Sequence, residues 1–406
     1  MLPFFVGYLY CICKCKIVRL APNGDVWVFC ALDYETLSTE AQEIIRIPDL
    51  KCPEKKEFYN QEAQKMTWQE VLENARGNVG PYCKACNICN GKACGKTVPG
   101  PGAKGVGDTA VRNYEAWQRI RVNLDTITEN RTPDTSFTFF GYDMKYPIFA
   151  GPVGAVNLHY GDKMNDVEYN NILVPGCREA GIAAFTGDGV NPVVMEASSK
   201  AIAEADGCGV PTIKPWDPDT LQIKYRLVHE SNAVAAAMDI DGAGLPFLQN
   251  LTPPAGSKTV EELGEIVKSV GRPFIVKGIM TVKGALKAKK AGAAGIVVSN
   301  HGGRVQDQCP STAEVLPAIA KAVGDEMMIL VDGGIRSGVD IFKALAMGAD
   351  AVVIARPYVT AVYGGGKEGI LALTEKLGGE LRDTMKMCGA ADLGEITEDC
   401  VFYGKF

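Results

Sequence analysis

Eight short apolar runs recur between residues 146 and 357, and each is apolar throughout instead of alternating with polar residues. Continuous runs of this kind are typical of strands in a parallel sheet, which is buried on both faces. Helix-like stretches such as TVKGALKAKKAGA separate many of them, at roughly the spacing that a strand–helix repeat requires. The runs are YPIFAGPVGA (146–155), GIAAFTG (181–187), VPTIKPW (210–216), AVAAAMDID (233–241), PFIVKGI (273–279), AGIVVSN (294–300), MMILVDGGI (327–335) and AVVIARP (351–357).

Eight strand–helix units are the number that closes a (β/α)8 TIM barrel, and the alternative α/β architecture is an open doubly wound sheet. We favour the barrel because of this number and because polar residues follow the runs at their carboxyl-terminal ends, where barrel enzymes carry their chemistry. A chain of 406 residues suits one barrel with an appended segment. We therefore predict a poorly defined N-terminal extension over 1–65, a cysteine-rich segment with a Pro/Gly linker over 66–110, and the barrel over 111–406.

Composition excludes some partners. The net charge is −6, and no block of lysine and arginine interleaves with aromatic residues, so nucleic acid is not an expected partner. The N-terminal run MLPFFVGYLY has no basic residue before it and is too short to span a bilayer. We predict no transmembrane segment and a cytoplasmic location, where clustered cysteines serve metals or redox chemistry more often than disulfides.

The last two apolar runs end in segments suited to an anion. VDGGIRSG (331–338) and ARP (355–357) follow the seventh and eighth expected strands, whose loops commonly bind phosphate in such barrels. Gly333 and Gly334 let the backbone approach an anion, while Arg336 and Arg356 supply charge and forked donors. The alternative is that the glycines only form turns and the arginines only form surface pairs.

Two further residues at strand ends predict redox chemistry. Lys277 ends the fifth run, and a lysine in a buried parallel strand needs an anion beside it. That anion is either a carboxylate such as Asp332 or a cofactor that becomes negative when it is reduced. His301 follows the sixth run; it is either a satisfied core histidine or a general base oriented by Asp241, with Arg304 facing a substrate carboxylate.

VKGIMTVKGALKAKKAGAAGIVVSNHGGR and VDGGIRSGVDIFKALAMGADAVVIARP closely resemble the FMN-dependent 2-hydroxy acid dehydrogenases and oxidases. The resemblance implies FMN as cofactor, His301 as base with Asp241 as its partner, Lys277 against the flavin N1/O2 edge, and Arg304 on the substrate carboxylate. The other positions that it places around the cofactor are Ser299 at the ring system, the backbone of Pro152, Val153 and Gly154 near N5, Asp332, Gly334, Arg336 and Arg356 at the ribityl chain and phosphate, and Lys214 where the family has a glutamine.

The chain departs from the family mainly on the substrate side. Trp216 stands where the family has an active-site tyrosine, and no match for the N-terminal substrate tyrosine is found. Asp239 replaces a threonine, Ala355 replaces the glycine before the last phosphate arginine, and the loop after the fourth strand is much shorter. Trp216 therefore joins His301 and Arg304 as a candidate substrate residue, and a simple 2-hydroxy acid is the expected substrate.

A cysteine cluster precedes the barrel. YCKACNICNGKACGK places Cys83, Cys86, Cys89 and Cys94 in a C-x2-C-x2-C-x4-C run. The close triple spacing favours iron–sulfur ligation, although the last gap is longer than in ferredoxins and Gly95 replaces the usual proline. A four-cysteine zinc site and four unconnected thiols are the alternatives. An iron–sulfur centre would pass electrons from the flavin to an external acceptor.

The expected function is oxidation of a 2-hydroxy acid, of the lactate, glycolate or mandelate kind, by an FMN enzyme. Its electrons would leave to a redox protein or another acceptor, and the family resemblance suggests a homo-oligomer. The alternatives are a flavin or iron–sulfur reductase or isomerase with another substrate, and a redox sensor without turnover.

Overall fold

The computed structural model describes residues 65–403, apart from 246, 247, 249, 253 and 254, together with two short paired strands, β1 (Arg19–Leu20) and β2 (Val26–Trp27). By its contacts the chain divides into two units, Met1–Gln64 and Lys65–Phe406. Most of the predicted N-terminal extension lies outside the described residues. The predicted cysteine-rich segment belongs to the same unit as the barrel.

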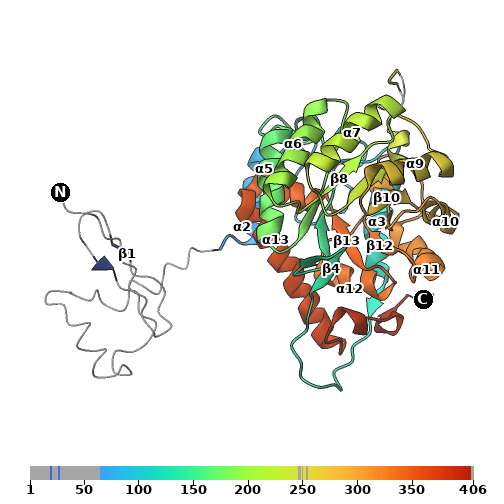
Figure 1. Cartoon of the computed structure of the whole chain (residues 1–406). Coiled ribbons are helices and arrows are strands. Elements are labelled where there is room, and N and C mark those ends of the chain that lie inside the picture. Colours follow the sequence, from blue (N-terminus) through green and yellow to red (C-terminus); the bar gives the residue numbers. More distant parts are fainter. Residues whose placement is uncertain are drawn as a thin grey trace, which may run out of the picture. The chain divides into compact units, whose positions relative to one another are not determined.

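Eight parallel strands close into a barrel, so the predicted (β/α)8 architecture is confirmed and an open sheet is excluded (Figure 1). Each strand pairs with its neighbours in chain order, and the last strand returns to the first. Their residues are buried on both faces, which explains why the sequence runs do not alternate. The strands are β6 (Ile148–Ala150), β7 (Ala183–Thr186), β8 (Val210–Ile213), β9 (Ala236–Asp239), β10 (Phe274–Ile279), β11 (Gly295–Val298), β12 (Met328–Val331) and β13 (Ala351–Ile354).

Helices follow the strands and surround the barrel (Figure 1). Their starts are encoded locally: Thr259 and Ser311, for example, each form a capping box with the glutamate three residues later. The surrounding helices are α4 (Val156–Tyr160) and α5 (Asp166–Glu179) after β6, then α6 (Pro192–Glu204), α7 (Pro218–Glu230), α9 (Val260–Val270), α10 (Val282–Lys290), α11 (Thr312–Val323), α12 (Gly338–Ala346) and α13 (Arg356–Met387).

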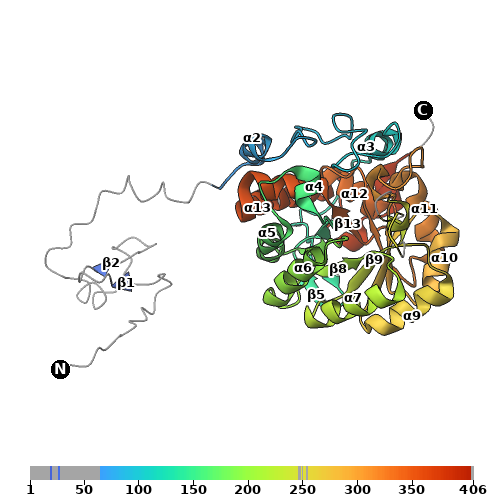
Figure 2. The same ribbon diagram turned by 90° about the horizontal axis from the view of Figure 1, so that it is seen from above.

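Two segments occupy opposite ends of the barrel. The hairpin of β4 (Phe137–Phe139) and β5 (Tyr142–Met144) precedes β6 at the amino-terminal ends of the strands. Helices α2 (Trp68–Asn78) and α3 (Asp108–Arg119), with the irregular residues 79–107 between them, lie along the other side (Figure 2). We call residues 79–107 the connecting segment, and the carboxyl-terminal strand ends the rim.

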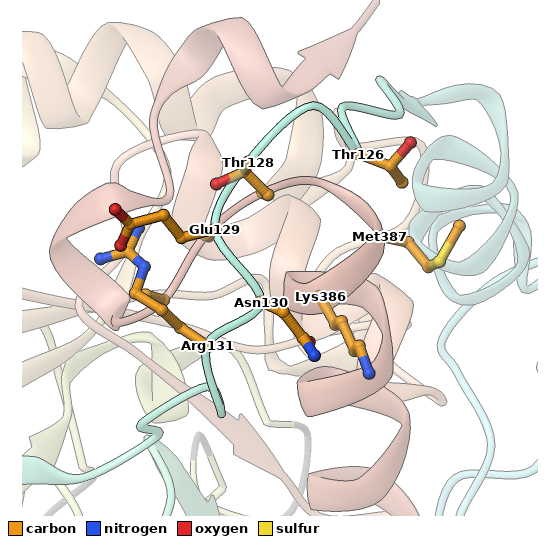
Figure 3. A pocket seen from close by; sticks show the side chains of 10 residues that line it. Thr126, Thr128, Glu129, Asn130, Arg131, Lys386 and Met387 are labelled. Atoms are coloured by element: carbon orange, nitrogen blue, oxygen red, sulfur yellow. The ribbon is translucent and has the colours of Figure 1, made fainter.

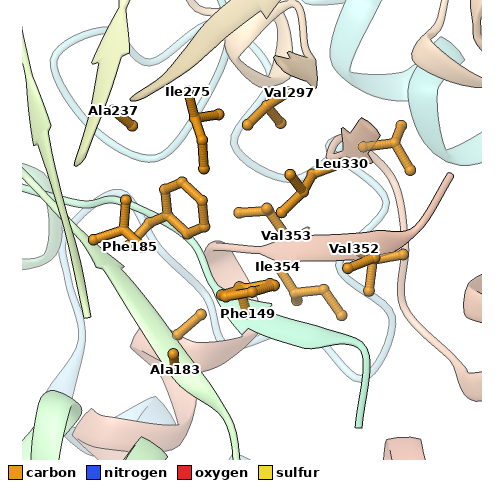
Figure 4. Packing of buried hydrophobic residues seen from close by; sticks show 14 of the residues in the cluster. Phe149, Ala183, Phe185, Ala237, Ile275, Val297, Leu330, Val352, Val353 and Ile354 are labelled. Atoms are coloured by element: carbon orange, nitrogen blue, oxygen red, sulfur yellow. The ribbon is translucent and has the colours of Figure 1, made fainter. Parts of the chain in front are cut away.

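The barrel interior is filled by apolar side chains of the strands (Figure 4). Phe149 of β6 and Phe185 of β7 meet edge to face, with ring centroids 5.3 Å apart, among aliphatic residues of β10 to β13 (Figure 4). Because this interior is packed, a ligand can bind only at the ends of the strands.

A two-stranded ladder of β3 (Arg121–Val122) and β14 (Val401–Phe402) joins the C-terminal part of the chain to the segment after α3. The short helices η4 (Leu393–Glu395) and η5 (Glu398–Cys400) precede β14. Among the described helices, none combines the length and the apolar character that crossing a membrane would need.

Candidate active site

A buried chain of alternating charges lies at the rim. Lys277 stands opposite Asp239 in the parallel ladder of β10 and β9, and its Nζ is 2.9 Å from Asp239 Oδ1 and 3.5 Å from Asp332 Oδ2. Lys214, just beyond β8, places its Nζ 2.5 Å from the other oxygen of Asp239. The lysine predicted to need an anion therefore has two carboxylates, and the closer one is not the Asp332 considered from sequence.

Burial and charge act in opposite directions on these groups. Burial would raise the pKa of Asp239, but Lys214 and Lys277 outweigh it and hold that pKa well below its usual value. Burial would lower the pKa of Lys277, yet Asp239 and Asp332 together raise it. The pKa of Asp332 is raised because burial outweighs the effects of Lys277 and Ser299. Asp239 is thus a carboxylate and Lys277 an ammonium.

The imidazole of His301 lies next to the carboxylate that the sequence suggested. His301 opens the short helix η3 (His301–Gly303), and its Nδ1 is 3.0 Å from Asp241 Oδ1 on η2 (Ile240–Gly244). A Cβ on Gly278 would come within 2.6 Å of the Asp241 side chain, so glycine leaves room for the pair. The His301 backbone is left-handed, with φ of 57°, and its N–H donates to Ser299 Oγ at 3.1 Å.

Three arginines predicted to bind anions contact backbone carbonyls. Arg336 donates from Nε to Cys89 O at 2.7 Å, Arg304 donates from NH1 to Gly100 O and Gly102 O, and Arg356 donates from NH2 to Gly302 O at 2.9 Å. Within the described residues, the Arg304 guanidinium donates hydrogen bonds only from NH1 and the Arg356 guanidinium only from NH2. Each therefore keeps most of its guanidinium donors for a ligand.

Gly333 and Gly334 have a packing role that the sequence did not reveal. Both are left-handed, with φ of 82° and 86°, and a Cβ on Gly334 would lie 2.2 Å from the carbonyl oxygen of Asn113 in α3. Trp117 of the same helix donates its indole N–H to Gly333 O at 2.8 Å. The structure explains these glycines first by the close approach of α3; their predicted contact with phosphate stays a prediction.

Trp216 differs from the tyrosine that it replaces because its polar atom is already used. Its Nε1–H donates to Asp188 Oδ2 at 2.5 Å, and the other oxygen of Asp188 accepts from Lys224 Nζ at 2.8 Å. All three residues are buried. The indole therefore offers a ligand no hydrogen-bond donor.

The backbone predicted to face the flavin lies in the turn after β6. A Cβ on Gly151 would sit 2.8 Å from the Cβ of Ala355, and one on Gly154 would sit 2.8 Å from Val194. The residues between them, Pro152 and Val153, are half-buried. The turn after β6 therefore packs against Ala355 at the end of β13. A cofactor that bound at both strand ends would need this close approach.

His159 is a site residue that the sequence analysis missed. It lies in α4, directly after β6, is 8% exposed, and its Nδ1 accepts from the Gly100 N–H at 3.0 Å. Burial, with the charges of Arg304, Lys214 and His301, lowers its pKa to about 3. One signal was available: His159 is one of three histidines, and it follows a barrel strand.

The four clustered thiols are half-buried, and Cys89 contacts Arg336, one of the arginines predicted to bind phosphate. Arg336 reaches Cys89 through both its carbonyl oxygen and its sulfur, at 2.7 and 3.8 Å. Burial raises the pKa of Cys83 to about 11, and burial likewise raises those of Cys86 and Cys94. The four sulfur atoms are not gathered within 4.8 Å of one another, whereas one tetrahedral zinc ion needs them about 3.8 Å apart.

In the described part of the chain, three ligand atoms of Asp239, Asp241 and His301 do lie within 4.8 Å of one another. Lys214 and Lys277 already neutralise Asp239, so this group is a charge-paired cluster and not a cation site.

A cavity of about 170 Å³ lies away from the rim, between residues 126–131 and the end of α13 (Figure 3). None of its lining residues comes from the rim.

Unpaired polar atoms at the rim fit a polar cofactor. Thr186 Oγ1 at the end of β7, Asp241 Oδ2 and Asp332 Oδ1 are buried and have no hydrogen-bond partner among the described residues. Buried polar atoms are normally satisfied, so these three atoms at the carboxyl-terminal strand ends are available to a bound ligand. With a buried ammonium and two arginines beside them, these residues match the ring, ribityl and phosphate groups of FMN.

The comparison with known proteins agrees with this site. The family model described as FMN-dependent dehydrogenase matches residues 101–206 and 222–403. The chain belongs to this family, and it is therefore a flavin-dependent barrel oxidoreductase with FMN as its cofactor.

Individual relatives match over most of their length. The chain is 30% identical over 325 residues to a peroxisomal (S)-2-hydroxy-acid oxidase of Oryza sativa subsp. japonica, covering 72% of this chain and 87% of that protein. It is 27% identical to an L-lactate oxidase of Lactobacillus jensenii, covering 70% and 75%. A mandelate oxidase crystal structure with 2-hydroxy-phenylacetamide superposes with a TM-score of 0.66 at 26% identity, over 83% of this chain and 97% of that one.

Proposed function

We propose that this protein oxidises a small 2-hydroxy acid to the 2-oxo acid. The observation that carries the proposal is the pairing of His301 with Asp241 on the rim, beside the buried ammonium of Lys277. Relatives named 2-hydroxy-acid oxidase, L-lactate oxidase and mandelate oxidase support this substrate class. When bound, FMN supplies the acceptor for the hydride equivalent that leaves the substrate carbon.

Residues of the chain would take the proton, hold the substrate and supply positive charge. Asp241 accepts the Nδ1–H of His301, which leaves the lone pair of Nε2 to take the proton of the substrate hydroxyl. The unused donors of Arg304 hold the substrate carboxylate. Lys277, held by Asp239 and Asp332, would present a fixed positive charge to the bound cofactor.

Cofactor binding is assigned to the rest of the rim. Arg336 and Arg356 would hold the phosphate, and Asp332 with Ser299 would bind the ribityl chain and ring edge; Ser299 Oγ already donates to Asp332 Oδ2 at 2.9 Å. The pair of Lys214 and Asp239 replaces two neutral side chains of the family. It would place an ammonium and a carboxylate, paired with each other, beside the cofactor.

The test is anaerobic reduction of the bound flavin by a panel of L- and D-2-hydroxy acids, followed by stopped-flow absorbance. Fast bleaching by at least one acid, lost in His301→Asn, supports the proposal. Bleaching by reduced nicotinamide alone would indicate a reductase, and no bleaching by any donor would indicate a redox sensor. His229→Asn, an exposed histidine on α7, is the matched control and should bleach like the wild type.

For the cysteine cluster, we propose an iron–sulfur centre that carries electrons from the flavin to a redox protein. The support is the run of four thiols and the position of Cys89 on Arg336, at the expected phosphate end of the cofactor. The cysteine sulfur atoms around an iron–sulfur cluster lie farther apart than those around a single zinc ion. The sulfur atoms of the four cysteines here are not within 4.8 Å of one another, as the wider spacing of a cluster requires. Each turnover would release two electrons, one at a time, and two protons to solvent.

Anaerobically purified protein tests this centre. Iron and acid-labile sulfide should be present in the wild type and absent from Cys86→Ser/Cys89→Ser, which should still be reduced by substrate at the wild-type rate. Zinc in place of iron, or no metal at all, would overturn the proposal. A cytoplasmic location and a homo-oligomer remain predictions from sequence.

A further inference from the structure

The two histidines near the rim differ in what holds their Nδ1 atoms. His301 Nδ1 faces a carboxylate, which only accepts hydrogen bonds, so this nitrogen carries a proton. His159 Nδ1 faces the backbone N–H of Gly100, which only donates, so this nitrogen carries none. The tautomers of the two imidazoles are therefore opposite.

The opposite tautomers give the two Nε2 atoms complementary chemistry. His301 is left with a lone pair on Nε2, as a base requires. His159 is buried among positive charges that lower its pKa to about 3, so it is neutral at ordinary pH and its proton resides on Nε2. Among the described residues, this Nε2 has no hydrogen-bond partner. His159 is a neutral donor held in one orientation.

One residue places His159 beside the expected carboxylate site. Gly100 donates its N–H to His159 Nδ1 and accepts from Arg304 NH1 through its carbonyl oxygen. The hydrogen-bond donor that the family's active-site tyrosine would provide is missing from this site. Trp216 stands in its place, and the indole N–H of Trp216 already donates to Asp188. A substrate carboxylate has about four lone-pair sites, more than one arginine satisfies.

We propose that the Nε2–H of His159 is a second donor to the substrate carboxylate, working beside Arg304 and taking the place of the absent phenol. This assignment rests on the proposed function. It gives the site two histidines with separate tasks, in which His301 accepts the hydroxyl proton and His159 fixes the acid group.

Two substitutions at position 159 separate the two nitrogens. Asparagine keeps an acceptor near the Nδ1 position for Gly100 but loses the distal donor, whereas glutamine keeps an amide donor near the Nε2 position. The measurement is the dissociation constant of pyruvate or benzoylformate, whichever perturbs the wild-type flavin spectrum more. FMN affinity, melting temperature and the limiting rate of flavin reduction are recorded alongside, with His229→Asn as the control.

We expect His159→Asn to weaken acid binding about tenfold to a hundredfold, the loss expected for a hydrogen bond to a charged group, with the limiting rate and FMN affinity little changed. His159→Gln should recover most of that affinity. Equal binding by His159→Asn and wild type overturns the inference, and so does a loss in His159→Gln as large as that in His159→Asn. If no acid perturbs the wild-type flavin, the proposed function itself fails, and this inference fails with it.

The tautomers give a readout that does not depend on substrate. With three histidines in the chain, long-range ¹H–¹⁵N spectra of the FMN-loaded protein can assign each ring. His159 should show a protonated Nε2 and a bare Nδ1 near pH 7. The reverse pattern would overturn the inference even if binding data agreed with it.

Discussion

The charged group at the strand ends and the connecting segment meet on the same rim, but different interactions hold each of them in place. Lys214, Asp239, Lys277 and Asp332 are held by strand register and pair side chain with side chain. The connecting segment, residues 79–107, has no regular structure over most of its length and is held by rim cations that bind its backbone carbonyls. The difference shows that the barrel sets the electrostatics, while an irregular segment sets access to the arginines.

The largest effect should come from breaking the strand-end group. Lys277→Met leaves Asp239 and Asp332 without their shared cation, so we expect a loss of about 3–5 kcal/mol in the free energy of unfolding and flavin reduction slowed by orders of magnitude. Urea unfolding and stopped flow measure the two. Lys277→Met/Asp332→Asn, which leaves the pair of Lys214 and Asp239 intact, should regain stability but not rate; a double variant that recovers both would contradict the assignment of Lys277.

His301→Asn should reduce the rate of flavin reduction by about 10²–10⁴-fold, the usual contribution of a positioned base, with a small change in melting temperature. Asp241→Asn should slow it less, because the imidazole remains and only its orientation and tautomer suffer. If the aspartate variant proved slower than the histidine variant, Asp241 would have to touch the substrate itself.

On the other side of the comparison, Gly334→Ala tests how α3 is seated on the rim. The new Cβ would lie 2.2 Å from Asn113 O, so we expect a loss of roughly 1–3 kcal/mol in stability and weaker FMN binding. Gly379→Ala in α13 is the matched control, since its Cβ meets nothing within 4 Å. It should stabilise the helix by up to about 1 kcal/mol. Equal melting temperatures for both variants would refute the packing role.

The last prediction concerns pH. The pKa of His159 is lowered from 6.5 to about 3 by burial and neighbouring positive charge. The unfolded chain therefore binds a proton that the folded chain does not, and stability falls as pH drops from about 6.5 towards 3. His159→Asn should lose up to one proton of that pH dependence in urea unfolding between pH 7 and 4. Parallel curves for variant and wild type would show that His159 is not buried neutral.

The sequence predicts the barrel and the rim because both depend on local pattern. Uninterrupted apolar runs identify buried strands, and the residues after each run must lie at one end, which brings Lys277, His301 and Asp241 together. It does not predict that Asp239 is the closest partner of Lys277, because that follows from the register of β9 against β10.

His159 and the connecting segment mark where sequence reasoning ends. The histidine receives its hydrogen bond from a glycine 59 residues earlier, in a stretch with no periodicity to place it. Trp216 was expected as a changed substrate residue, but only the structure shows its N–H committed to Asp188. Contacts of this kind depend on tertiary geometry, and no residue spacing in the sequence indicates them.

The left-handed backbone of His301 has a consequence for how this chain would change under selection. At φ of 57° a side chain is strained by about 1–2 kcal/mol, and glycine would sit there without that strain. A lineage screened only for heat resistance would drift towards glycine at 301 and become inert. The imidazole of His301 is thus held at a cost in stability, and the catalytic role proposed for it would account for that cost.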